Sequence, residues 1–266
     1  MTADGAESFM ILYRRKMLET NKIYEGDCLE VMRDIDDGSV DAIICDLPYA
    51  TTSNQWDVLI PFEPLWEQYN RIIKPKGNIV LFANNRFMFE LYASQPRLYR
   101  YDLVWQKSKC GSPFTAKYMP MKKHENILVF GHSGAYYEPQ MEKGEPYHRN
   151  WTPNKANNHK YGISGTEHHN EGTRHPSTIL NFPQKWRRQD QVHPTQKPVE
   201  LMEWLIRTYC PADGLVLDNC CGSGSTCVAA VRTSRQYIGI ELELKYAEIA
   251  RQRCLEEENR ISSQLF

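Results

Sequence analysis

The sequence has no long apolar run, little net charge and no paired cysteine spacing, and each absence excludes a class of protein. No stretch approaches the roughly 20 apolar residues of a membrane-spanning helix, and residues 1–19 lack the apolar core of a signal peptide. The formal net charge of −1 excludes a uniformly basic protein, so a nucleic-acid surface would have to be a local patch. The eight cysteines form no C-x-x-C pair, which argues against a zinc site or a secreted disulfide framework. We therefore expect a reduced, cytoplasmic setting without membrane contact.

Short apolar runs alternate with segments of helical spacing along most of the 266 residues. The runs predict strands at 22–25, 40–45, 78–82, 101–105, 126–130 and 215–218, and the spacing predicts helices at 28–35, 61–73, 86–93, 199–210 and 244–257. Such alternation predicts an α/β fold with a doubly wound, mostly parallel sheet. A chain of this length can form one such core that carries an insertion.

The stretch Asp46-Leu47-Pro48-Tyr49 follows a buried apolar strand, 40–45. Asp46 is therefore expected at the carboxyl end of a parallel strand, where open α/β sheets place their ligands. An acidic residue that merely opens a βα loop is the structural alternative for this short motif on its own.

A second stretch, 215–226, reads as strand, glycine turn and helix start. Its polar and small residues include Asp218, Cys220, Gly222, Ser223, Gly224, Ser225 and Thr226. A glycine turn lets backbone approach a ligand, and the helix start offers free N–H groups to an anion. Glu241 follows about 20 residues after Asp218, the separation at which an acid meets a ribose diol in dinucleotide-type folds. A third glycine at Rossmann spacing is absent, which disfavours NAD.

These two stretches, together with Gly26-Asp27-Cys28 and His193-Pro194-Thr195-Gln196-Lys197-Pro198, resemble the amino-methyltransferases of DNA. The catalytic motif of that family reads Asp/Asn/Ser-Pro-Pro-Tyr, and here Leu47 stands at the first proline. The catalytic half precedes the cofactor half, as in the permuted β group of site-specific adenine-N6 enzymes. The resemblance implies a circularly permuted, Rossmann-like methyltransferase fold and S-adenosylmethionine as cofactor. The expected division is a catalytic half, 1–130, a target-recognition insertion, 131–192, and a cofactor half, 193–266.

The resemblance also implies roles for individual residues. Asp46, Leu47, Pro48 and Tyr49 would be catalytic. The cofactor would be bound by Asp27, Thr195, Gln196, Lys197, Glu241 and the polar and small residues of 218–226 given above. For Asp27, the competing interpretation is a helix N-cap.

Two regions are candidates for contact with duplex DNA. Between residues 107 and 123, Lys107, Lys109, Lys117, Lys122 and Lys123 accumulate without an acidic residue, which indicates a basic loop facing phosphates or a solvated surface loop. In the region 131–192, Lys185, Arg187 and Arg188 could contact phosphate or guanine. Histidines gather in that region, but at irregular spacing without partners at ligand offsets, so we predict no metal site.

The expected chemistry is methyl transfer to the N6 amine of adenine in a specific duplex sequence. Asp46 and the carbonyl of Leu47 would accept the two amino protons, and Tyr49 would stack on a base flipped out of the duplex. Asp46 favours adenine by resemblance, since members acting on cytosine N4 usually begin the motif with serine. The alternatives are a cytosine-N4 enzyme, an RNA substrate, or a DNA-binding module without turnover. A homodimer and a cognate restriction endonuclease as partner are left open.

Overall fold

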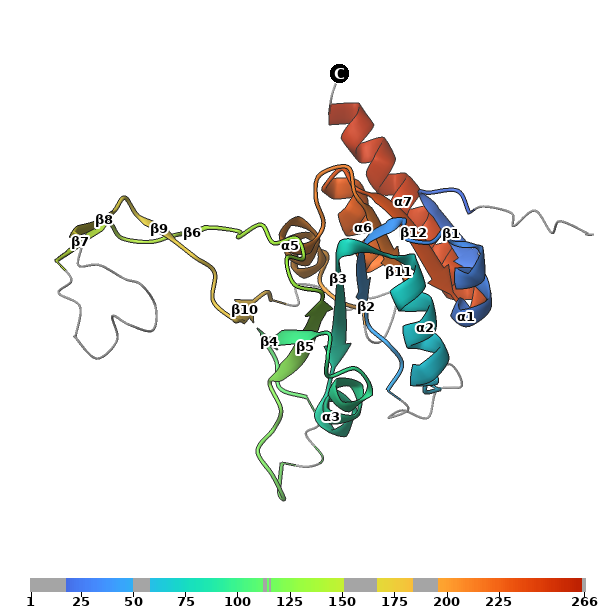
Figure 1. The fold of residues 1–266 in the computed structure, drawn as a ribbon, viewed down its shortest axis with the longest axis horizontal. Coiled ribbons are helices and arrows are strands. Elements are labelled where there is room, and N and C mark those ends of the chain that lie inside the picture. Colours follow the sequence, from blue (N-terminus) through green and yellow to red (C-terminus); the bar gives the residue numbers. More distant parts are fainter. Residues whose placement is uncertain are drawn as a thin grey trace, which may run out of the picture.

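A computed structural model describes residues 18–49, 58–111, 114, 116–150, 167–183 and 196–264. Its centre is an eight-stranded sheet in the order β1-β12-β11-β2-β3-β5-β4-β10 (Figure 1). The strands are β1 (Lys22–Glu25), β2 (Val40–Cys45), β3 (Ile73–Ala83), β4 (Tyr99–Gln106), β5 (His124–Gly131), β10 (Ile179–Asn181), β11 (Leu215–Asp218) and β12 (Gln236–Glu241). All neighbouring pairs are parallel except those of β5, which runs against both β3 and β4. The predicted doubly wound, mostly parallel sheet is confirmed.

Helices cover both faces of the sheet, because successive strand residues alternate between two apolar clusters. On one face Ala42 and Ile44 pack with residues of α5 (Val199–Tyr209), α6 (Ser225–Arg232) and α7 (Leu244–Gln264). On the other face Ile43 and Cys45 pack with α1 (Cys28–Val31), the 3₁₀ turn Met32–Asp34, α2 (Phe62–Ile72) and α3 (Asn85–Ser94). None of the described helices is both long and apolar enough to cross a bilayer.

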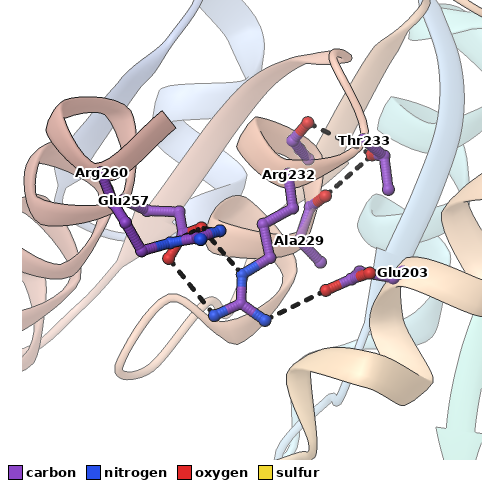
Figure 2. Close-up of polar contacts among 7 residues, drawn as sticks. Glu203, Ala229, Arg232, Thr233, Glu257 and Arg260 are labelled. Atoms are coloured by element: carbon purple, nitrogen blue, oxygen red, sulfur yellow. Dashed lines mark hydrogen bonds and ion pairs between the residues drawn. The ribbon is translucent and has the colours of Figure 1, made fainter. Parts of the chain in front are cut away.

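A polar cluster joins the three helices of the first face (Figure 2). Arg232, the last residue of α6, lies 3.1 Å from Glu203 of α5 and 3.0 Å from Glu257 of α7. Arg260 also pairs with Glu257. Burial raises the pKa of Glu257, but the two guanidinium groups outweigh burial and hold that pKa below its ordinary value. These ion pairs fix α5, α6 and α7 as one layer over the cofactor half of the sheet.

Several predicted boundaries shift. The predicted helix 28–35 is divided into the short helix α1 and the 3₁₀ turn Met32–Asp34. Helix α7 continues to Gln264 rather than ending at 257. The stretch Lys74-Pro75-Lys76-Gly77, which separates the predicted helix 61–73 from the predicted strand 78–82, lies inside the long strand β3. A register shift between Val40 and Ala42 lets β2 pair with both ends of this stretch.

The described residues of the region 131–192, which are 131–150 and 167–183, form an arm and one strand of the core. β6 (Glu142–Lys143) pairs with β9 (Thr173–Arg174), and β7 (Tyr147–Asn150) pairs with β8 (Glu167–Asn170), both antiparallel. Figure 1 shows this arm reaching away from the sheet. The chain then returns as β10, an edge strand of the central sheet whose position is fixed by the Trp105 indole donating to the Phe182 carbonyl at 2.9 Å. The core therefore takes its last strand from within the region predicted as an insertion.

Candidate active site

Four parallel strands bring polar residues to one edge of the sheet. Glu241 and Asp218 are the last residues of β12 and β11, and Asp27 and Asp46 come just after β1 and β2. These four acids line a single cavity of about 480 Å³. The parallel order β1-β12-β11-β2 explains the convergence, because the carboxyl ends of parallel strands meet at one edge. The sequence prediction of a ligand site at these strand ends is therefore matched by one contiguous pocket.

Most of the residues predicted at the site line this cavity. From the catalytic motif they are Asp46, Leu47, Pro48 and Tyr49; from the cofactor set they are Asp27, Gln196, Lys197, Asp218, Cys220, Gly222, Ser223, Ser225, Thr226 and Glu241. Thr195 and the loop at 50–57 lie outside the described residues. Val58, Leu59 and Ile60, just after that loop, form an apolar side of the cavity.

The two turn glycines have different roles. Gly222 has a φ of +52° and lines the cavity, and its amide donates to a Glu241 carboxylate oxygen at 2.7 Å. Gly224 has a φ of +80° and faces α7 instead, where an added Cβ would come within 2.8 Å of the Ala250 Cβ. Gly224 is therefore needed for close helix packing, and it is not among the residues that line the cavity.

The acidic residues around the cavity are already partly engaged by backbone. Glu241 accepts from the amides of Gly222 and Glu243, and Asp218 accepts from the Cys220 amide at 3.2 Å. Asp27 caps α1 by accepting from the Leu29 amide at 2.8 Å, which is the structural alternative considered for it. Burial raises the pKa of Asp218 to about 6. The turn is thus held in shape by the same carboxylates that face the cavity.

The catalytic motif is organised around the Asp46 carboxylate. Its Oδ1 accepts from the Tyr49 hydroxyl at 2.5 Å, and its Oδ2 is ion-paired with the Lys197 ammonium. Burial raises the pKa of Asp46, and Lys197 opposes that rise. Burial and the nearby Asp46 charge raise the pKa of Tyr49 well above its ordinary value, so Tyr49 stays a hydrogen-bond donor. The Leu47 side chain is buried in the core, and the Tyr49 ring packs on Phe87 with 4.8 Å between centroids.

Two lysines take positions that the sequence did not indicate. Lys197, predicted as a cofactor ligand, lines the cavity but pairs with Asp46. Lys107, predicted to face DNA phosphates, pairs with the buried Glu125, a contact that the sequence did not indicate. Lys109, Lys117 and Lys123 are exposed on the basic loop, and Lys122 donates to the Asn85 side chain at 3.0 Å. Lys185, Arg187 and Arg188 lie outside the described residues.

Sequence reasoning missed Glu125, Leu242 and Tyr246. Glu125 is the second residue of β5, directly before the strand predicted at 126–130, and is only 7 % exposed, so an acid next to a predicted strand was the available signal. It reaches the site because β5 is antiparallel, which brings its amino end to the edge where the parallel strands end. Leu242 and Tyr246 line the cavity directly after Glu241, and their proximity to that acid was the only indication of a role.

A family model described as DNA methylase, of the N6/N4 type, matches residues 40–252. The chain belongs to the DNA methylase family. Its activity is that of a DNA methyltransferase with S-adenosylmethionine as cofactor, as the sequence resemblance implied. The match runs from the strand before Asp46 to the helix after Glu241, and so includes both halves of the cavity.

Individual relatives are similar to this DNA methylase over most of their length. The Type II methyltransferase M2.MboI of Moraxella bovis is 25% identical over 258 residues, covering 87% of this chain and 86% of the relative. The M1.HpyAVI structure, a complex with SAM, has a TM-score of 0.60 at 22% identity and covers 87% of this chain and 98% of its own. The cytosine-N4-specific PvuII DNA methyltransferase has a TM-score of 0.63 at 18% identity, with 92% and 93% covered. The two structural likenesses establish the fold.

The residues at the glycine turn suit the cofactor. Ser225 begins α6, is 6 % exposed, lines the cavity, and its hydroxyl has no hydrogen-bond partner among the described residues. A buried hydroxyl without a partner is costly, so a polar ligand is expected to supply one. The cavity combines this hydroxyl with a helix start, the four acids at the strand ends and apolar walls, which fits a ligand with an amino-acid end and a nucleoside end.

Proposed function

We propose that this DNA methyltransferase modifies the N6 amine of adenine in a specific sequence of duplex DNA, with the target base flipped out of the helix. The observation that supports this most is that Asp46 and the glycine turn border the same cavity. A cofactor methyl group and a target amine can therefore meet next to Asp46. Because Asp46 rather than serine opens the motif, adenine is favoured over cytosine.

In this proposal the cavity holds the cofactor by its two ends. The N-terminus of α6, with Ser225 and Thr226, binds the methionine carboxylate, and Glu241 at the end of β12 accepts from the ribose hydroxyls. Asp27 contacts the adenosine end. Bound S-adenosylmethionine would supply an electrophilic methyl group attached to a sulfonium centre.

The chain itself prepares the target nitrogen. The lone pair of an exocyclic amine is delocalised into the adenine ring, so the amine is a weak nucleophile. Asp46 and the Leu47 carbonyl accept hydrogen bonds from its two N–H groups and so turn the lone pair toward the methyl group, and the nitrogen loses one proton only after the methyl group is attached. The Tyr49 hydroxyl fixes the Asp46 carboxylate, and the Tyr49 ring stacks on the base. The attraction between the Asp46 carboxylate and the amine is strongest when positive charge develops on the nitrogen. Catalysis therefore consists of orientation and electrostatic stabilisation.

Two surfaces are proposed to contact the duplex. The basic loop leaves β4 and returns through β5, at the same edge of the sheet as the cavity, and carries the exposed Lys109, Lys117 and Lys123. Phe114 and Tyr118 on this loop are 92% and 85% exposed, which suits contact with an opened base stack. The arm of β6 to β9 extends from the core and is proposed to read the DNA sequence (Figure 1).

Methyl transfer to duplex DNA, followed by mass spectrometry of the nucleosides, tests the proposal. N6-methyladenine is expected, and long-read sequencing of DNA from expressing cells then gives the recognition sequence. N4-methylcytosine alone would overturn the adenine assignment, an outcome to which the PvuII likeness gives weight. Duplex binding without transfer of labelled methyl would point to a binding module and contradict the enzymatic proposal.

A further inference from the structure

Lys197 stands between two carboxylates that come from different strands. Its ammonium is ion-paired with Asp46 Oδ2 and lies 3.5 Å from Glu125 Oε2. The Lys197 side chain is 7% exposed and lies over the Phe82 ring, with 5.0 Å between Nζ and the ring centroid. The apolar ring confines the ammonium to the space between the two acids, so a small displacement exchanges one partner for the other.

The contact with Asp46 works against the proposed chemistry. Both carboxylate oxygens of Asp46 already accept from the protein, one from Tyr49 and one from Lys197. An ammonium on Oδ2 weakens that oxygen as an acceptor for an amino proton. It also places positive charge close to a nitrogen on which positive charge must develop, and like charges in a water-poor site repel strongly. The arrangement described here therefore suits the enzyme before the base arrives.

Glu125 offers the ammonium a second position. Its Oε1 is ion-paired with Lys107, whereas Oε2 is buried and has no hydrogen-bond partner of ordinary geometry in the described part of the chain. Burial raises the pKa of Glu125, but Lys197 and Lys107 outweigh burial and hold it below its ordinary value, so Glu125 is ionised. A buried carboxylate oxygen without a full hydrogen bond is costly, and Lys197 is the donor within reach.

We propose that Glu125 is a positioning residue that receives the Lys197 ammonium when the target amine enters, and thereby frees Asp46 Oδ2 to accept an amino proton. This inference rests on the proposed function. Glu125 does not line the cavity and acts through Lys197. Lys107 pairs with Oε1 of Glu125. The two acids, Asp46 and Glu125, and the two lysines, Lys107 and Lys197, therefore sum to zero charge whichever acid Lys197 contacts. The charged and titratable groups around the exchange are Asp46, Tyr49, Glu125 and Lys197, with Lys107 and Lys122 on the side of Glu125 and Cys45 and Asp218 on the side of Asp46.

Glu125→Gln tests the exchange, with Glu248→Gln on the exposed side of α7 as matched control. Without the second acid, Lys197 stays on Asp46, and kcat should fall about 10- to 100-fold, less than the loss from removing a direct contact to the reacting group. The KM for S-adenosylmethionine should stay near the wild-type value. The acidic limb of the kcat profile should move to lower pH, because Glu125 no longer raises the pKa of Asp46 while Lys197 still lowers it.

A double-mutant cycle separates this role from a merely structural one. In a Lys197→Met background, adding Glu125→Gln should change kcat by less than about threefold, because the acid then has no ammonium to receive. Equal losses in both backgrounds would overturn the proposal, and so would a lower kcat in Glu125→Gln with an unmoved pH limb.

A wild-type structure covers the case in which these variants do not fold. In a complex with S-adenosylhomocysteine and duplex carrying the recognition sequence, Lys197 Nζ should lie within about 3.2 Å of Glu125 Oε2 and beyond hydrogen-bond distance of Asp46. An ammonium still bonded to Asp46 beside a flipped base would overturn the inference. Failure of the proposed function is distinguishable, because the wild-type protein would then transfer no methyl to DNA or would methylate a base other than adenine.

Discussion

Glu241 and Gly222 are joined by a hydrogen bond of 2.7 Å from the Gly222 amide to the Glu241 carboxylate. The acid proposed to bind the ribose therefore also fixes the glycine turn that borders the cavity. Glu241 accepts from the Glu243 amide as well, at 2.9 Å. A substitution of Glu241 therefore removes a proposed cofactor contact and two structural hydrogen bonds at the same time. Its effects on cofactor binding and on stability have to be measured together.

We predict that Glu241→Ala raises the KM for S-adenosylmethionine much more than it lowers kcat, because the ribose is remote from the transferred methyl group. It should also lower stability by about 1–3 kcal/mol, since two backbone amides lose their acceptor. Steady-state kinetics and urea unfolding measure the two effects. An unchanged KM in a folded variant would contradict the assignment of this acid to the cofactor.

Ser225→Ala should give the kinetic effect without the loss of stability. The Ser225 hydroxyl has no partner among the described residues, so its removal breaks no hydrogen bond within that part of the chain. We expect a higher KM for the cofactor, a nearly unchanged kcat and a midpoint of urea unfolding close to that of the wild type. A KM equal to that of the wild type would remove Ser225 from the proposed binding site.

Asp46→Ala should lower kcat by about 10²–10³, the cost of losing one preorganised electrostatic contact to a developing charge. Cofactor and duplex affinities should change far less, because the glycine turn and the basic loop are untouched. Asp46→Asn is the matched variant, since it keeps the size of the side chain that lies beside Lys197. Single-turnover kinetics and equilibrium binding give the measurement. Near-normal kcat, or a folded variant unable to bind the cofactor, would contradict the central role of Asp46.

Asp218 should make stability depend on pH. Its pKa of about 6 lies above that of an unfolded aspartate, about 3.9, so the folded state holds the proton more tightly. Stability contributed by this group is therefore present at low pH and is lost as pH rises from about 4 to about 6, by roughly 3 kcal/mol. Urea unfolding of wild type and Asp218→Asn across this range should show the two free energies diverging. Parallel curves would show that Asp218 ionises normally.

The lysines of the basic loop should differ in their effect on DNA binding. Lys109→Gln and Lys117→Gln should each reduce the slope of log K against log salt by about 0.9, as expected for one lost phosphate contact. Lys107→Gln should leave the slope unchanged, because Lys107 pairs with Glu125. Filter binding or fluorescence anisotropy at several salt concentrations measures these slopes. A slope reduced only by Lys107→Gln would reverse our placement of the phosphate contacts.

The sequence by itself determined most helices and strands of the core outside 131–192, and the identity of the residues at their ends. The strands at 22–25 and 40–45 were predicted at their observed bounds, because short runs of strand-forming residues limited by glycine or proline are local signals. Asp46 and Asp218 were likewise placed at strand ends by the apolar runs before them, and Glu241 was identified by its separation from Asp218. Their convergence followed from one rule, that parallel strands present their carboxyl ends at a common edge.

Only the tertiary structure decided which charges meet. Lys197 and Asp46 are 151 residues apart in sequence, and Glu125 joins them because β5 is reversed between β3 and β4. Strand order and direction depend on how the two apolar faces are covered by helices, and a local pattern of residues does not encode that packing. The same reason explains Gly224, which sits in a motif typical of ligand binding but faces Ala250 of a helix far along the chain.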